Sequence, residues 1–234
     1  MRSADVSPWT AVVFDFDGLI LDTETPLYDA WRTTFEHHGA EPIPLDEWLS
    51  SLGLHDDDPR RLDPFARLQA AVDRDLDSEE VQAARRVLKD TAIAAELLRP
   101  GVTGVLDQAD ELGLPVAVAS SSSFEWVGGH LAGRGLLHRF ATISCAENGV
   151  PGKPAPDTYL RACAAIGVAP TGALALEDSP NGVRAAKAAG LTCVAVPNPI
   201  SRTLDYSHSD ATLTSLEELD LTLPIARYQP TAPS

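Results

Sequence analysis

Short apolar runs alternate with longer amphipathic segments along most of this chain. The runs have the length of buried strands and lie at residues 12–17, 116–119, 173–176, 193–196 and, more briefly, 211–213. The amphipathic segments between them end at Gly113, Gly167 and Gly190, and glycine commonly follows the last turn of a helix. Strands that alternate with helices are typical of βαβ units and of a largely parallel sheet. The pattern therefore predicts an α/β fold with a doubly wound, Rossmann-like core of at least four strands and a short edge strand at 211–213.

Residues 24 to 95 follow a helical pattern instead. One helical face near the start of this stretch carries Leu27, Ala30, Trp31, Thr34 and Phe35. Asp63 before Pro64 is typical of a helix N-terminus, and Asp77 three residues before Glu80 resembles a capping box. Because no convincing strand is predicted here, we expect a small α-helical domain inserted after the first core strand.

These patterns predict where the chain divides. We expect residues 1–22 and 96–234 to form the α/β core and residues 23–95 to form the helical domain. The segment 224–234 holds three prolines and few apolar residues, so we expect a loosely ordered tail there.

The charge and the cysteines narrow the class of protein. The formal net charge is −16, which argues against binding to nucleic acid or to an anionic membrane surface. The three cysteines show no close pairing, so reduced thiols and a cytoplasmic location are expected. The sequence contains neither an apolar run long enough to span a membrane nor an apolar signal core in residues 1–8.

Polar side chains recur directly after the predicted strands. They stand at four places, which are Asp15 with Asp17, then Ser120, then Lys153, then Glu177 with Asp178. Residues two apart in a strand point the same way, and open α/β sheets bind ligands at the carboxyl ends of their strands. We therefore expect these side chains to meet at one edge of the sheet.

That set of side chains suits phosphoryl transfer. A carboxylate that approaches a phosphate is repelled by roughly 4 kcal/mol per charge pair at about 4 Å and an effective dielectric constant near 20. A lysine and a divalent cation would offset this repulsion. Carboxylate oxygens at Asp15, Asp17 and Asp178, without nitrogen or sulfur ligands, favour Mg²⁺ over zinc.

The residues of these motifs and their order along the chain resemble those of the haloacid dehalogenase superfamily, and in particular of its β-phosphoglucomutase-like branch. The matching segments are Asp15-Phe16-Asp17-Gly18 continued to Glu24, Gly152-Lys153-Pro154, and Glu177-Asp178-Ser179-Pro180-Asn181-Gly182. The resemblance extends over most of the chain, roughly from residue 12 to residue 197. It implies that the helical insertion is the small α-helical cap of that branch.

The resemblance also implies a role for each residue. Asp15 would be the nucleophile that forms an aspartyl phosphate and binds Mg²⁺, and Asp17 would be the general acid and base, lending its backbone carbonyl to the metal. The phosphoryl group would be held by Ser120, by Lys153 and by a group in the serine run such as Ser121. Asp178 would bind the metal, with Glu177 assisting from the second layer of contacts.

Two activities remain open at this point. An acid at Asp17 favours phosphate esters over halides, because an alkoxide needs a proton to leave and a halide does not. A sugar-phosphate mutase is the alternative to a phosphatase, but Leu27 stands where the mutase has a histidine, and the insertion has no evident basic cluster for a second phosphate. A catalytically idle binding protein is a third and weaker hypothesis.

The expected partner is a small phosphorylated metabolite, with a sugar or polyol phosphate preferred. The loop 52–58, which contains Asp56, Asp57 and Asp58, is the candidate for leaving-group selection, although a solvated turn is slightly favoured for it. The sequence leaves open the physiological substrate and whether the protein is a monomer or a small homo-oligomer.

Overall fold

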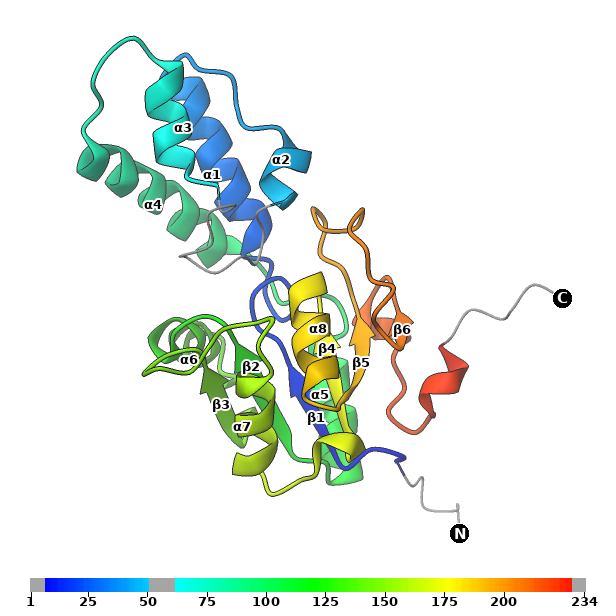
Figure 1. Ribbon diagram of the computed structural model, residues 1–234. Coiled ribbons are helices and arrows are strands. Elements are labelled where there is room, and N and C mark those ends of the chain that lie inside the picture. The colour runs from blue at the N-terminus through cyan, green and yellow to red at the C-terminus, as the bar shows by residue number, and fades with distance from the viewer. Residues whose placement is uncertain (1–6, 51–61, 229–234) are drawn as a thin grey trace, which may run out of the picture. The chain divides into compact units, whose positions relative to one another are not determined.

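The computed structural model describes residues 7–50 and 62–228. The chain forms two compact units, one of Met1–Leu21 with Leu98–Ser234 and the other of Asp22–Leu97. The first unit is an α/β core, and the second is helical (Figure 1). The loop 52–58 that we singled out in the sequence lies outside the described residues.

A parallel sheet forms the centre of the first unit. Its strands are β1 (Ala11–Phe14), β2 (Val116–Ser120), β3 (Thr142–Cys145), β4 (Ala173–Glu177), β5 (Thr192–Ala195) and β6 (Ala211–Thr212). They lie in the order β3-β2-β1-β4-β5-β6, and every neighbouring pair is parallel. The predicted α/β fold class is confirmed, including the edge strand, which is β6.

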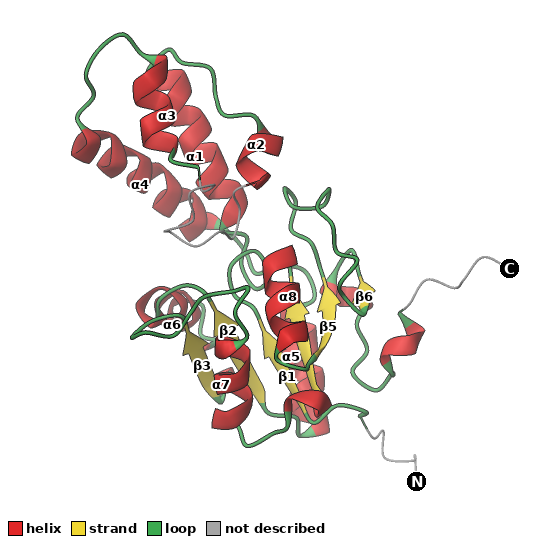
Figure 2. Ribbon diagram, viewed as in Figure 1, coloured by secondary structure: helices red, strands yellow, loops and turns green. Residues whose placement is uncertain are grey.

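Helices cover both faces of this sheet. They are α5 (Val102–Leu112), α6 (Phe124–Gly133), α7 (Asp157–Ala165) and α8 (Pro180–Ala188), with short 3-10 turns η1 (Leu137–Arg139), η2 (Pro170–Gly172), η3 (Leu216–Glu218) and η4 (Ile225–Arg227). In Figure 2, α7 and α8 lie in front of the sheet, and α5 and α6 lie behind it. Alternate residues of β1 such as Val13 pack into the apolar cluster under α7 and α8, which includes Tyr159 and Val183.

The second unit contains four helices in the part of the chain that the structure describes. These are α1 (Glu24–His37), α2 (Leu45–Ser50), α3 (Pro64–Ala71) and α4 (Ser78–Ala95). Asp22 Oδ1 accepts a hydrogen bond from the Thr25 N–H at the start of α1, 3.0 Å away. Asp63 accepts the Ala66 N–H at the start of α3, where Pro64 takes the first position, as the sequence predicted.

The chain leaves and re-enters the core at adjacent positions. Leu21 and Leu98 form an antiparallel β-bridge, and the Arg99 N–H donates to the Ile20 carbonyl at 3.0 Å. The helical unit thus begins one residue before and ends two residues after the range expected from the sequence. Among the described residues, no helix is both long enough and apolar enough to cross a membrane.

The end of the described chain differs from the loose tail expected for 224–234. Residues 225–227 form η4, and the Tyr228 hydroxyl accepts the Asp220 N–H at 2.7 Å. The remaining residues, 229–234, lie outside the described part.

Candidate active site

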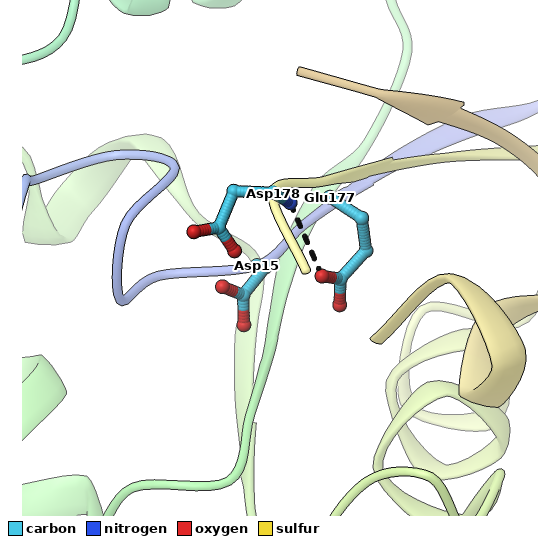
Figure 3. Close-up of side chains that lie close together, drawn as sticks. All are labelled: Asp15, Glu177 and Asp178. Carbon is cyan, nitrogen blue, oxygen red and sulfur yellow. Dashed lines mark hydrogen bonds between the residues drawn. The ribbon is translucent and has the colours of Figure 1, made fainter. Parts of the chain in front are cut away.

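The carboxyl ends of β1 and β4 place three acidic residues together. Asp15 directly follows β1, and its N–H donates to the Leu176 carbonyl of β4 at 2.9 Å. Glu177 is the last residue of β4, and Asp178 follows it. Figure 3 shows the three side chains side by side. The site therefore follows from the adjacency of two parallel strands that have carboxylates at or directly after their carboxyl ends.

This acidic cluster can hold a divalent cation. One carboxylate oxygen from each of Asp15, Glu177 and Asp178 lies within 4.8 Å of the others. The three residues are only 6%, 0% and 2% exposed, so water screens their mutual repulsion poorly. The ligands on offer are oxygens, which hard cations such as Mg²⁺ and Ca²⁺ prefer. The donor set and the excess of negative charge both fit a bound cation.

Lys153 supplies the positive charge at this cluster. It lies in the loop between β3 and α7, and its Nζ contacts the Asp15 carboxylate and lies 2.6 Å from Glu177 Oε1. Burial alone would lower the pKa of Lys153, but the carboxylates of Asp15 and Glu177 outweigh burial and raise it. The lysine is therefore fully charged. Burial raises the pKa of Asp15, and Lys153 opposes that rise.

Glu177 is committed to contacts within the protein. Its Oε1 accepts the Lys153 ammonium and the Tyr159 hydroxyl, each at 2.6 Å. Its Oε2 accepts the N–H of Asp178 at 3.2 Å and the Ser179 hydroxyl at 3.3 Å. A Cβ at Gly182 would lie 2.0 Å from this carboxylate carbon, so only glycine leaves room for it. These contacts suit a group that orients Lys153 rather than one that faces the substrate.

A buried network that the sequence analysis missed holds Asp178. The Asn198 side-chain amide donates to Asp178 Oδ2 at 2.7 Å, and the hydroxyls of Ser201 and Tyr206 donate to the Asp178 carbonyl. Gly18, with φ of +83°, passes so close that a Cβ there would lie 1.9 Å from the same Oδ2. No spacing rule connects these positions, since they meet only when the loops after β1, β4 and β5 come together.

The Asp17 side chain accepts hydrogen bonds from residues other than those that contact the acidic cluster. The Ser122 hydroxyl donates to its Oδ2 at 2.6 Å, and the Trp126 indole N–H donates to its Oδ1 at 2.8 Å. From the sequence we expected Asp15, Asp17 and Asp178 to bind the metal, and the side-chain oxygens that cluster in the structure belong to Asp15, Glu177 and Asp178. The role expected for the Asp17 backbone carbonyl stays a prediction.

All four residues of the serine run 120–123 make hydrogen bonds near the site, and Ser120 and Ser122 both lie against Asp17 Oδ2. Ser120 is buried, accepts the Ser122 N–H at 3.0 Å and lies 3.5 Å from Asp17 Oδ2. The Ser121 hydroxyl accepts the Lys153 N–H at 3.1 Å, and Ser123 caps α6 by accepting the Trp126 N–H at 3.3 Å. The run therefore connects β2 to the Lys153 loop and to Asp17. Phosphate binding by Ser120 and Ser121 stays a prediction.

Comparison with known proteins agrees with this geometry. A family model described as haloacid dehalogenase-like hydrolase matches residues 9–190. YhcW of Bacillus subtilis, a candidate phosphatase, is 41% identical over 213 residues, covering 91% of this chain and 94% of its own. Hexitol phosphatase B of Escherichia coli is 32% identical over 214 residues, and the alignment covers 89% of this chain and 93% of the relative.

A solved structure gives the same result. CbbY from Rhodobacter sphaeroides in complex with phosphate superposes with a TM-score of 0.70 at 29% identity, covering 90% of this chain and 96% of that one. The family match extends over most of the chain and includes all four groups of polar residues. The chain belongs to the haloacid dehalogenase-like hydrolases.

Proposed function

We propose that this protein is a Mg²⁺-dependent phosphatase that hydrolyses small phosphomonoesters through an aspartyl phosphate on Asp15. The chain is a phosphoric monoester hydrolase of the haloacid dehalogenase type. The observation that carries the mechanism is the direct contact of Lys153 with Asp15, while Asp17, two residues on, is hydrogen-bonded separately. This arrangement supports Asp15 as the nucleophile beside a cationic side chain and Asp17 as the acid and base.

The reaction has two steps. In the first, an Asp15 carboxylate oxygen forms a bond to phosphorus while the ester P–O bond breaks, and Asp17 gives its proton to the departing oxygen. In the second, Asp17 takes a proton from water, whose oxygen bonds to phosphorus as the acyl phosphate bond to Asp15 breaks. Lys153 stabilises the carboxylate before attack and the negative phosphoryl oxygens during it.

Mg²⁺ would be held by Asp15 and Asp178, and when bound it would neutralise charge on the phosphoryl oxygens. Glu177 supports this arrangement by orienting Lys153. The unbalanced negative charge of three buried carboxylates and one lysine supports the presence of a cation.

The proposed substrates are sugar or polyol phosphates. Hexitol phosphatase B, a relative similar along nearly its whole length, supports this class. We propose that the helical unit is the cap that selects the leaving group, as in the branch that the sequence resembles. A mutase would use a second sugar phosphate in place of water, and the experiment below distinguishes the two.

The test is an assay of purified protein with Mg²⁺ and a panel of sugar, polyol and nucleotide monophosphates, in which free phosphate and isomerised sugar phosphate are both measured. We expect phosphate release from sugar or polyol phosphates, and a loss of about 1,000-fold or more in Asp15→Asn. Asp107→Asn is the matched control, since Asp107 pairs with Arg139 on the surface of α5. Isomerised product with little free phosphate would favour the mutase, and no turnover would favour a binding protein.

A further inference from the structure

The side chain of Trp126 makes a contact that the proposed mechanism does not require. Its indole N–H donates to Asp17 Oδ1 at 2.8 Å, from the first turn of α6. The Ser122 hydroxyl donates to the other oxygen, Oδ2, at 2.6 Å. The Ser120 hydroxyl also lies 3.5 Å from Oδ2, so both carboxyl oxygens are held by donors and the plane of the Asp17 carboxyl is fixed.

Trp126 is itself held from two sides. Its backbone N–H donates a hydrogen bond to the hydroxyl of Ser123, the residue that caps α6. Its ring meets the edge of the His130 ring one turn later, with centroids 4.2 Å apart and planes at 77°. His130 in turn stacks on Phe16, with centroids 6.1 Å apart, and Phe16 lies between the two catalytic aspartates. The start of α6 is thereby packed against the segment that carries Asp17.

The two donors differ chemically in a way that matters for an acid. An indole N–H can only donate, so it keeps Oδ1 as an acceptor. A hydroxyl can donate or accept, so the Ser122 contact on Oδ2 is compatible with either form of the carboxyl. Trp126 therefore holds Oδ1 in the same position whether or not the other oxygen carries a proton.

We propose that Trp126 is a positioning residue that orients the Asp17 carboxyl for proton transfer to the leaving group. This inference rests on the proposed function, because it assigns Trp126 to the acid step of that reaction. It predicts an effect that depends on the leaving group. An alkoxide from a sugar or polyol phosphate needs the proton, whereas 4-nitrophenolate leaves without it.

The experiment compares wild type, Trp126→Phe and Asp17→Asn on two substrates, a hexitol 6-phosphate and 4-nitrophenyl phosphate. The value measured is kcat/KM, which reports the steps up to departure of the leaving group. We expect Trp126→Phe to lose about 10- to 100-fold on the hexitol phosphate, a part of the roughly 10²- to 10⁴-fold typical of acid catalysis. On 4-nitrophenyl phosphate we expect less than about threefold loss, and this activity also shows that the variant is folded.

Trp9→Phe is the matched control. Trp9 lies just before the first residue of β1, whereas the catalytic aspartates follow its last residue, so this substitution should leave the activity on both substrates unchanged. In the double variant Trp126→Phe/Asp17→Asn, we expect little loss beyond that of Asp17→Asn alone, since both changes act on one step. An equal loss on both substrates, no loss on either, or additive losses in the double variant would overturn the role of Trp126. Failure of wild type to release phosphate would instead overturn the proposed function.

Discussion

Several hydrogen bonds to the buried carboxylates of the site come from residues in other segments of the chain. Glu177 is bonded by Lys153 and Tyr159, and Asp178 is bonded by Asn198. Burial, followed by the neighbouring Glu177 carboxylate, raises the pKa of Tyr159, so its hydroxyl stays protonated and able to donate. A buried carboxylate without such donors would cost several kcal/mol, so these hydrogen bonds stabilise the buried site.

A thiol next to this site gives a pH prediction. Burial raises the pKa of Cys145 from its ordinary 9.0 to about 11, and the carboxylates of Glu147 and Asp17 add to the rise. The unfolded chain loses this proton first as pH rises, so the contribution of Cys145 to stability declines above about pH 9. At pH 8 the reactive thiolate is about 100-fold scarcer than for an ordinary thiol.

The measurement is iodoacetamide labelling of native protein between pH 7.5 and 9.5, followed by mass spectrometry of the Cys145 peptide. We expect the labelling rate to rise about tenfold per pH unit over the whole range. The same peptide labelled in urea is the control, and its rate should level off near pH 9. A native rate that levels off at the same pH would contradict the prediction.

The site residues differ in how far the sequence could predict them. Asp15, Lys153 and Asp178 stand in motifs directly after strands or in the connecting loop, and the structure brings them together. Trp126 lies in the first turn of α6 and Asn198 in the loop after β5, and neither position belongs to a motif that the sequence shows. Their contacts with Asp17 and Asp178 are seen only in the folded structure. Sequence patterns locate residues along elements, whereas support contacts depend on how separate loops meet.

Among the elements, the sequence predicted several helix ends correctly. Gly113 is the C-cap of α5, and Gly167 and Gly190 lie one residue past the C-caps of α7 and α8, all with positive φ. The predicted strand 12–17 was too long, since β1 ends at Phe14. The Phe16 carbonyl accepts N–H groups of residues 19–21, so a turn replaces the strand although Phe16 is apolar and buried.

One helix end in the helical unit is suited to a quantitative test. Asp77 caps α4, and its Oδ1 accepts the N–H groups of Glu79 at 2.8 Å and Glu80 at 3.1 Å. Asp77→Ala should therefore lower the free energy of unfolding by about 1 kcal/mol. The corresponding fall in Tm is about 2–4 °C. Thermal unfolding followed by circular dichroism measures it.

Asp77→Asn is the control for that change, because asparagine caps helices about as well as aspartate. It should keep Tm within about 1 °C of wild type. If both variants lose the same stability, the negative charge near the start of α4, and not the cap hydrogen bonds, is what stabilises the helix.

For the whole molecule, the acidic cluster predicts that stability depends on a cation. A ligand that binds only the folded state at 100 times its Kd stabilises by about 2.7 kcal/mol. We therefore expect Mg²⁺ to raise the Tm of the core by roughly 5–10 °C and EDTA to reverse the rise. Scanning calorimetry with and without Mg²⁺ measures both changes.

Asp178→Asn separates a specific site from a general salt effect. This variant removes one carboxylate of the cluster, so its Tm in EDTA should equal or exceed that of wild type, while the response to Mg²⁺ should largely disappear. A response of the same size in wild type and variant would mean that Mg²⁺ acts elsewhere on this acidic protein.

The position of β1 in the sheet has a consequence for how the protein is made. Of the six strands of this sheet, β1 is the first to be synthesised, but its neighbours are β2 and β4, and Val12 pairs with Val116 and Leu174. The intervening helical unit is complete before the first of these partners is synthesised. At about 5–20 residues per second, the uncharged segment Ala11–Phe14 waits roughly 5–20 seconds without a partner. During that time this apolar segment is open to chaperones and to self-association.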